Sequence, residues 1–279
     1  MRATLGLIAV VAACGGGDPL DKEKDIAGWA NSSSALGAYE WVREPVAFAD
    51  GAFMYGDAQC PTASDTGTTA TVTGNCTDAI GHAWTGTAVV EHGGSTRTVT
   101  LTDFGNDAFG GSVKATGTVT ITEQAPDRHS FEIDLVGGGG ITTTTKYSGT
   151  VVGTYDTATT WNGSGTITRD GDFFNGGTVT ATTVDQVRDG AGCPGENFSG
   201  TTTITSDEHV VVITYDGSTA CDPDHSARWT LDGKDQGTIA GVTCNAGGSG
   251  TGWVALVLVA LLLTSRRSSR GSCPSRTRR

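Results

Sequence analysis

The chain has 279 residues, of which 30 are acidic and 18 basic, and its formal net charge is −12. When Arg2 and the six arginines that follow residue 265 are set aside, 11 basic residues remain against 30 acidic ones, a net charge of −19. Such an acidic domain repels nucleic acid, which we exclude as a partner, whereas divalent cations are candidate partners. The 42 glycines and 45 threonines exclude a mainly helical protein, because glycine favours turns and threonine favours strands.

The first residues have the pattern of an export signal. Arg2 precedes a short apolar run, from Leu5 to Ala13, that is too short to span a membrane. The end of this run, Val11-Ala12-Ala13-Cys14, resembles the lipobox of bacterial lipoproteins. The resemblance implies that residues 1–13 are a signal peptide and that Cys14 is acylated, which gives stable membrane anchoring. We expect residues 14–24, which are polar and rich in glycine, to be a flexible tether.

A helical pattern follows the expected tether. Residues spaced by three and four positions include Ile26, Trp29, Ser33, Leu36, Tyr39 and Val42, and Pro45 comes soon after them. This spacing predicts a short amphipathic helix within residues 25–50, although two glycines weaken it.

From about residue 66 onward the apolar period changes to two. Segments such as "RTVTLTD", "GTVTITE" and "SFEIDLV" place valine and isoleucine on one face of a strand and threonine on the other. Glycine-rich and aspartate-rich turns separate these segments. We predict a mainly β ectodomain over residues 51–244, folded as an antiparallel up-and-down meander of about 10–12 strands. The sheet is expected to be curved or to form a partly closed barrel, with the N-terminal helix packed on it.

A short motif recurs in this region: an aromatic residue, any residue, glycine, then serine or threonine. The aromatic positions are Trp84, Tyr147, Trp161 and Phe198. We interpret the motif as a set of curvature points, where a ring covers the exposed backbone of a glycine. An aromatic strip that stacks on sugars is the alternative.

Four of the seven cysteines fall within the predicted ectodomain and away from both chain ends: Cys60, Cys76, Cys193 and Cys221. Disulfides are the default for such a set in an exported protein. We pair Cys60 with Cys76 and Cys193 with Cys221, because each pair closes a short loop. Other pairings, including Cys221 with Cys244, stay open.

The C-terminal residues 245–279 have the features of a sorting tail. Cys244 precedes a Gly/Ser spacer, and a run of 11 apolar residues then begins at Trp253. A helix of that length reaches across about half of a bilayer core. Arg266 and Arg267 follow this run. This order resembles the myxobacterial C-terminal sorting tail (MYXO-CTERM), which implies surface sorting of the upstream domain.

Motifs for catalysis and metal binding are weak in this chain. Asp65-Thr66-Gly67 matches the aspartic-protease triplet, but without a second copy we interpret it as a β-turn. Asp170 with Asp172, and Asp222 with Asp224, have carboxylates at alternate positions that suit Ca²⁺; we interpret them as turn formers, with weak cation binding as the alternative. Each of the five histidines is interpreted as a lone solvated side chain.

These patterns predict an exported, lipid-anchored protein of the outer membrane or cell surface, with a structural or adhesive ectodomain that is not an enzyme and needs no cofactor. The sequence does not identify a protein or glycan partner. One alternative is a barrel-like module that binds a small apolar ligand. Another is an envelope hydrolase, which has no motif behind it.

Overall fold

The structure, a computed structural model, describes residues 17–21, 23–35, 59–107, 113–139, 141–153, 158–170, 176–189, 197–215, 217 and 226–240. These residues form the helix α1 (Glu23–Ser33) and a single antiparallel sheet of 14 strands. The strands are β1 (Thr62–Asp65), β2 (Thr69–Thr73), β3 (Cys76–Thr77), β4 (Ala83–Gly93), β5 (Thr96–Asn106), β6 (Val113–Ala125), β7 (Arg128–Gly138), β8 (Thr142–Gly153), β9 (Ala158–Asp170), β10 (Gly177–Asp189), β11 (Asn197–Thr205), β12 (Val210–Thr214), β13 (Ala227–Leu231) and β14 (Lys234–Ile239).

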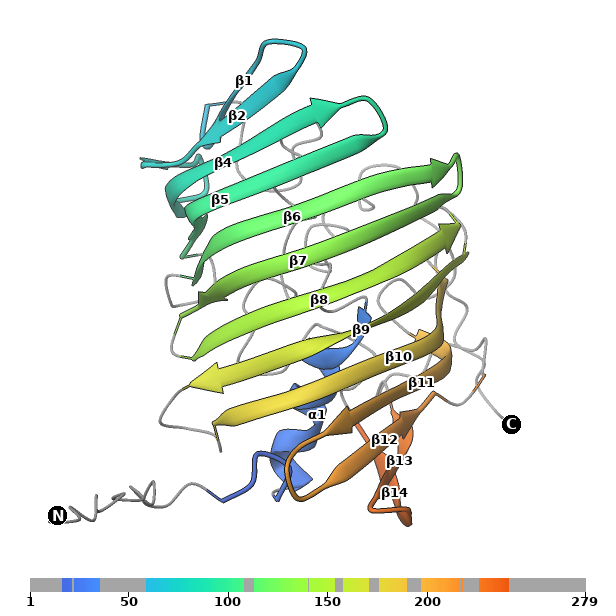
Figure 1. Cartoon of the computed structure of the whole chain (residues 1–279). Coiled ribbons are helices and arrows are strands. Elements are labelled where there is room, and N and C mark those ends of the chain that lie inside the picture. The colour runs from blue at the N-terminus through green and yellow to red at the C-terminus, as the bar shows by residue number, and fades with distance from the viewer. Residues whose placement is uncertain are drawn as a thin grey trace, which may run out of the picture.

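The strands follow one another across the sheet in chain order, as an up-and-down meander (Figure 1). Only β3 leaves this order among the described strands, since it pairs with β4 beside β2. The sheet does not close, so β1 and β14 are its edges. The predicted antiparallel meander with one N-terminal helix is confirmed. The sheet has more strands than the expected number of about 10–12, and it is open rather than a partly closed barrel.

Each long strand has one buried and one solvated face, as the alternation predicts. In β7, Phe131, Ile133 and Leu135 are buried, whereas Glu132 and Asp134 are exposed. Helix α1 packs on the buried side, which we call the inner face; the opposite side is the outer face. One row of paired inner-face residues crosses nine strands: Val90, Val99, Val119, Ile133, Tyr147, Gly165, Ala181, Ile204 and Val211.

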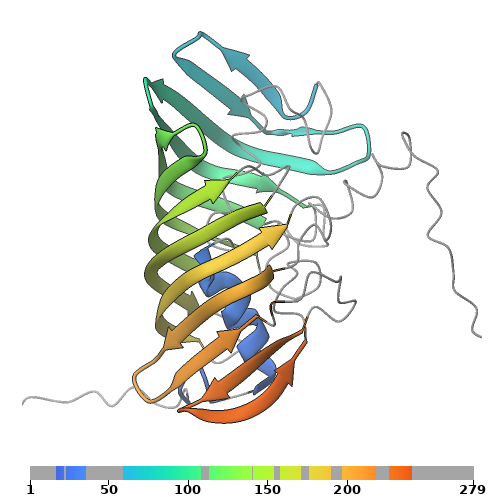
Figure 2. The same ribbon diagram turned by 90° about the vertical axis from the view of Figure 1, so that its right-hand side faces the viewer.

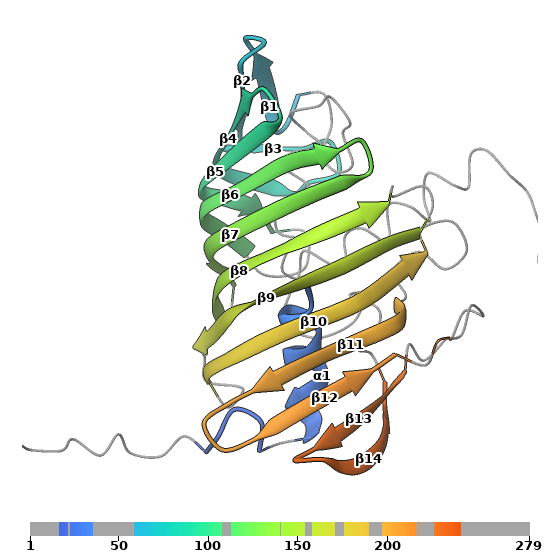
Figure 3. The same ribbon diagram turned by 45° about the vertical axis from the view of Figure 1, so that its right-hand side comes forward.

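Helix α1 lies against β9, β10 and β11 (Figures 1 and 2). Three residues of the predicted helical face, Ile26, Trp29 and Ser33, are fully buried. The remaining positions of that face, from Leu36 onward, lie outside the described residues. The sheet is strongly twisted, and β12 to β14 bend towards the side that carries the helix (Figure 3).

Small residues on the inner face leave room for the rings of neighbouring strands. A Cβ atom on Gly149 would lie 2.7 Å from Cζ of Phe131, and one on Gly163 would lie 2.6 Å from Cε1 of Tyr147. Gly165 lies under the same Tyr147 ring. Each ring therefore covers glycine backbone on an adjacent strand, as the aromatic-glycine motif led us to expect.

Two other motif glycines lie at β-bulges. Gly86 in β4 has a φ of +69° and faces Asp103 of β5, where the strand register shifts. Gly200 in β11 has a φ of +93° and faces Asp185 of β10, at a second register shift. Both aspartates also have positive φ, which aspartate tolerates better than most residues. Because bulges bend strands and increase their twist, these pairs are curvature points of the sheet.

Among the described residues, no helix combines the length and the apolar composition that a membrane span requires.

Candidate functional site

Most of the site residues that the sequence predicts lie outside the described residues. These are Cys14, Cys193, Cys221, Cys244, Trp253, Arg266, Arg267, Asp172, Asp222 and Asp224. Lipid attachment, the Cys193–Cys221 pairing and the sorting tail therefore stay predictions.

Three predicted features do lie within the described residues. Cys60 and Cys76 form a disulfide, as expected, which closes the segment that carries β1 and β2. Asp65 makes a turn between β1 and β2, where its Oδ1 accepts a hydrogen bond from the Gly67 amide at 2.6 Å. Asp170 is exposed at the end of β9. The described parts of the chain contain no cluster of three or more His, Cys, Asp or Glu side chains that could hold a metal ion.

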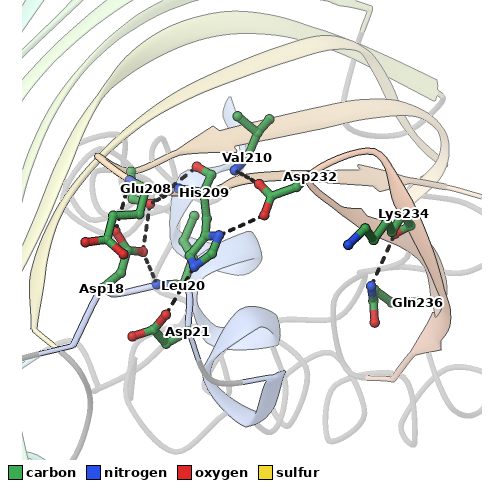
Figure 4. A network of polar contacts seen from close by, with 10 residues as sticks. Asp18, Leu20, Asp21, Glu208, His209, Val210, Asp232, Lys234 and Gln236 are labelled. Atoms are coloured by element: carbon green, nitrogen blue, oxygen red, sulfur yellow. Dashed lines mark hydrogen bonds and ion pairs between the residues drawn. The ribbon is translucent and has the colours of Figure 1, made fainter.

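A cluster of charged groups surrounds His209, in the turn between β11 and β12 (Figure 4). The Nδ1 atom of His209 lies 2.9 Å from Oδ2 of Asp232, which is in the turn between β13 and β14. Its Nε2 atom lies 3.1 Å from Oδ1 of Asp21, which precedes helix α1. We call Asp21, His209 and Asp232 the histidine clamp, because the imidazole joins three segments that are far apart in the sequence.

The clamp favours a charged imidazole. The hydrogen bond from the ring to Asp232 is the largest cause that raises the pKa of His209, burial opposes it, and the bond to Asp21 raises the pKa further. The amide of Val210 donates to Oδ1 of Asp232 at 2.9 Å, and this bond together with His209 lowers the pKa of Asp232. The His209 side chain is 24% exposed, so the clamp is solvent-accessible. The interpretation of His209 as a lone solvated histidine was wrong.

Asp18 fixes the same N-terminal segment a few residues earlier. Its Oδ1 accepts hydrogen bonds from the Ser206 hydroxyl at 2.7 Å and from the Leu20 amide at 2.9 Å. Its Oδ2 accepts from the Glu208 amide at 3.3 Å. Leu20 itself is 1% exposed. Within the expected tether of residues 14–24, Asp18 and Leu20 are therefore packed against the folded domain, and residues 23 and 24 already belong to α1.

The clamp does not have the arrangement of a hydrolase triad. Ser206 donates to Asp18 and also lies 3.3 Å from the backbone carbonyl of His209, while both ring nitrogens of His209 face carboxylates. An imidazole that activates a serine needs one ring nitrogen directed at the hydroxyl. The geometry instead suits a structural bridge.

Helix α1 is held to the sheet by a buried arginine. Nη2 of Arg169, on β9, donates to the carbonyl of Gly28 and to the hydroxyl of Ser32, each at 2.7 Å. The guanidinium carbon lies 4.5 Å from the centre of the Trp29 ring, a cation–π contact. Burial lowers the pKa of Arg169 to about 10, and the nearby charge of Asp25 opposes this shift. The arginine stays protonated near neutral pH.

Beyond the end of α1, buried hydroxyl groups of the sheet contact the chain that follows the helix. Thr183 on β10 accepts a hydrogen bond from the Ala35 amide at 3.0 Å, and its hydroxyl lies 3.1 Å from that of Tyr147. Tyr215 is within hydrogen-bond distance of Gln186. Burial raises the pKa of both tyrosines, so both remain neutral donors and acceptors.

Sequence reasoning missed these contacts, although one signal was present. The alternation in "GTITRD" places Arg169 on the same face as Ile167, which marks it as an inward-facing charge that needs partners. The His209 contacts had no comparable signal, because the bond to Asp21 joins residues 188 positions apart.

Compared with known proteins, the chain matches no family model, no curated protein and no solved structure.

Proposed function

We propose that this chain is a lipid-anchored protein of the cell envelope, exported and displayed at the outer membrane or cell surface. Its β domain acts as a structural or adhesive ectodomain rather than as an enzyme. Acylated Cys14 holds the chain in the membrane, and the C-terminal tail that begins near Cys244 acts as a sorting signal. Any protein or glycan partner and any cation would bind to the folded domain.

The observation that carries this proposal is the attachment of Asp18 to the sheet. Asp18 is bound to the turn between β11 and β12, and it lies four positions after Cys14, with three residues between them. Four extended residues span at most about 14 Å. A lipid on Cys14 would thus hold this end of the sheet close to the bilayer, with the β1 edge at the far end of the meander.

The Cys60–Cys76 disulfide supports export, because disulfides persist in oxidising compartments outside the cytoplasm. The sheet geometry favours the structural function over the apolar-ligand alternative. A barrel-like binding module needs a closed wall around its ligand, whereas this sheet is open and carries α1 on its inner face.

The test is acylation of the full chain in a bacterial host that processes lipoproteins, measured by incorporation of labelled palmitate. We expect label in the wild type and in Cys244→Ser, and no label in Cys14→Ser. Protease treatment of intact cells then reports surface display, which we expect to fail when residues 245–279 are deleted. Label that persists in Cys14→Ser would overturn the anchor assignment.

A further inference from the structure

We propose that the histidine clamp is a pH-sensitive latch, which holds residues 17–21 against the sheet while His209 carries a proton and loosens them when the proton leaves. The latch is a property of the folded domain, so it does not depend on the proposed lipid anchor.

The chemistry of the imidazole explains the switch. Protonated imidazole has two N–H groups, and each can donate to one carboxylate. Neutral imidazole has one N–H, so one ring nitrogen must present a lone pair. That nitrogen would then face a carboxylate oxygen, which is also an acceptor. One of the two clamp contacts is therefore lost on deprotonation.

The geometry decides which contact is lost. Asp232 is the closer partner, at 2.9 Å against 3.1 Å for Asp21, and the Val210 amide holds it in place. The remaining proton therefore stays on Nδ1, facing Asp232. The lone pair of Nε2 then faces Asp21, so the contact to the N-terminal segment breaks.

The surrounding charges strengthen this effect. Among the described side chains, several carboxylates lie in the segments that meet at the clamp: Asp18 and Asp21 before α1, Asp207 and Glu208 beside His209, and Asp232 in the turn between β13 and β14. Lys234, at the start of β14, is a described cation whose charge lowers the pKa of Asp232. Loss of the His209 proton leaves these carboxylates with less positive charge to balance them, and their mutual repulsion grows.

The direction of the pH dependence follows from the raised pKa of His209. A group whose pKa is higher in the bound state stabilises that state fully below its ordinary value, which is about 6.5 for histidine. The stabilisation disappears as the pH rises through the raised value. Asp232 stays ionised over this range, because its hydrogen bonds to the Val210 amide and to His209 lower its pKa.

Release would change the reach of the chain. If Cys14 is acylated, the start of α1 at Glu23 lies nine positions after the anchor, and a released chain of that length could span about 30 Å. Only this consequence rests on the proposed anchor. The domain would stand close to the bilayer in mild acid and further away in mild base.

Hydrogen exchange of the full chain in detergent tests the latch. The reporters are the amides of Leu20 and Glu208, which both donate to Asp18. Their protection factors, corrected for the intrinsic pH dependence of exchange, are compared at about pH 5 and about pH 9, on either side of the ordinary histidine pKa. Strands β7 and β8 serve as the internal reference. We expect a several-fold loss of reporter protection at the higher pH, with unchanged reference strands.

Three variants make the test specific. His209→Gln should show low reporter protection at both pH values. Asp21→Asn should keep its protection at about pH 9, because the neutral Nε2 can accept a hydrogen bond from the asparagine amide. His129→Gln, which removes a histidine on β7, should respond to pH as the wild type does. A pH-independent wild type, a pH response retained in His209→Gln, or loss of protection in Asp21→Asn would each overturn the latch.

Discussion

The inner face of the sheet is built in two different ways. Over β4 to β7 it is lined mainly by apolar side chains such as Val99, Val119 and Phe131, with the polar Asn106 buried at the end of β5. Over β8 to β11 it also buries polar residues, which are Thr143, Thr145, Thr159, Arg169, Thr183, Gln186, Arg188, Asn197 and Thr202. Helix α1 packs on the second region, at β9 to β11. We call the two regions the apolar half and the polar half.

The two halves differ because the polar half must supply hydrogen-bond partners to the helix, whereas the apolar half only has to bury apolar surface. An apolar side chain gains stability from burial alone, in any orientation that fills the space. The end of a helix, by contrast, brings backbone groups that have lost their helical partners. Thr183 supplies a partner to the Ala35 amide just beyond α1, and Arg169 adds a donor to the carbonyl of Gly28, in the middle of the helix. The polar half thus packs against the helix and also fixes its position by hydrogen bonds.

The largest effect is expected for Phe131→Ala in the apolar half. Phe131 is 1% exposed, and its ring centroid lies 6.0 Å from that of Trp161 and 6.4 Å from that of Tyr147. Truncating a buried aromatic side chain leaves a cavity and costs about 3–5 kcal/mol. Denaturant unfolding of the full chain, followed by tryptophan fluorescence, measures this loss. Glu132→Ala on the outer face of the same strand is the matched control and should change the stability by less than about 0.5 kcal/mol.

A smaller effect is expected within the polar half, for Gly163→Ala on β9. The new Cβ atom would lie 2.6 Å from the Tyr147 ring and 2.7 Å from the Ser148 carbonyl oxygen. Overpacking of this kind costs about 1–3 kcal/mol. Gly93→Ala is the control, because its Cβ would meet no atom closer than 3.6 Å. Equal free energies of unfolding for Gly163→Ala and Gly93→Ala would show that the Tyr147 ring does not pack closely on the backbone of Gly163.

The sequence predicted the apolar half well and the polar half only in part. Period-two alternation identifies β5, β6 and β7, because their inner residues are valine, isoleucine, leucine and phenylalanine. In β8 the segment "TTTT" places threonine on both faces, so hydrophobic periodicity cannot tell which hydroxyls are buried. The number of strands was underestimated because β3 has two residues and β14 is almost entirely exposed, and neither shows an alternating pattern.

The candidate site was harder to predict than the fold. The short spacing between Cys60 and Cys76 was enough to predict that these two cysteines form a disulfide. The partners of His209 and Arg169 could not be predicted in this way, because they depend on which segments the folded sheet brings together. Arg169 meets Ser32 across 137 positions of sequence. The sequence could mark Arg169 as an inward-facing charge, but it could not name the helix that receives it.

The most direct test of the two-half account is hydrogen exchange in Arg169→Met, using the full chain. Methionine keeps much of the apolar stem but removes the guanidinium that binds Gly28, Ser32 and Trp29. We predict faster exchange in residues 23–35, with β5 and β7 protected as in the wild type. Equal acceleration in α1 and in β5 and β7, or unchanged exchange in α1, would contradict the claim that the polar half holds the helix.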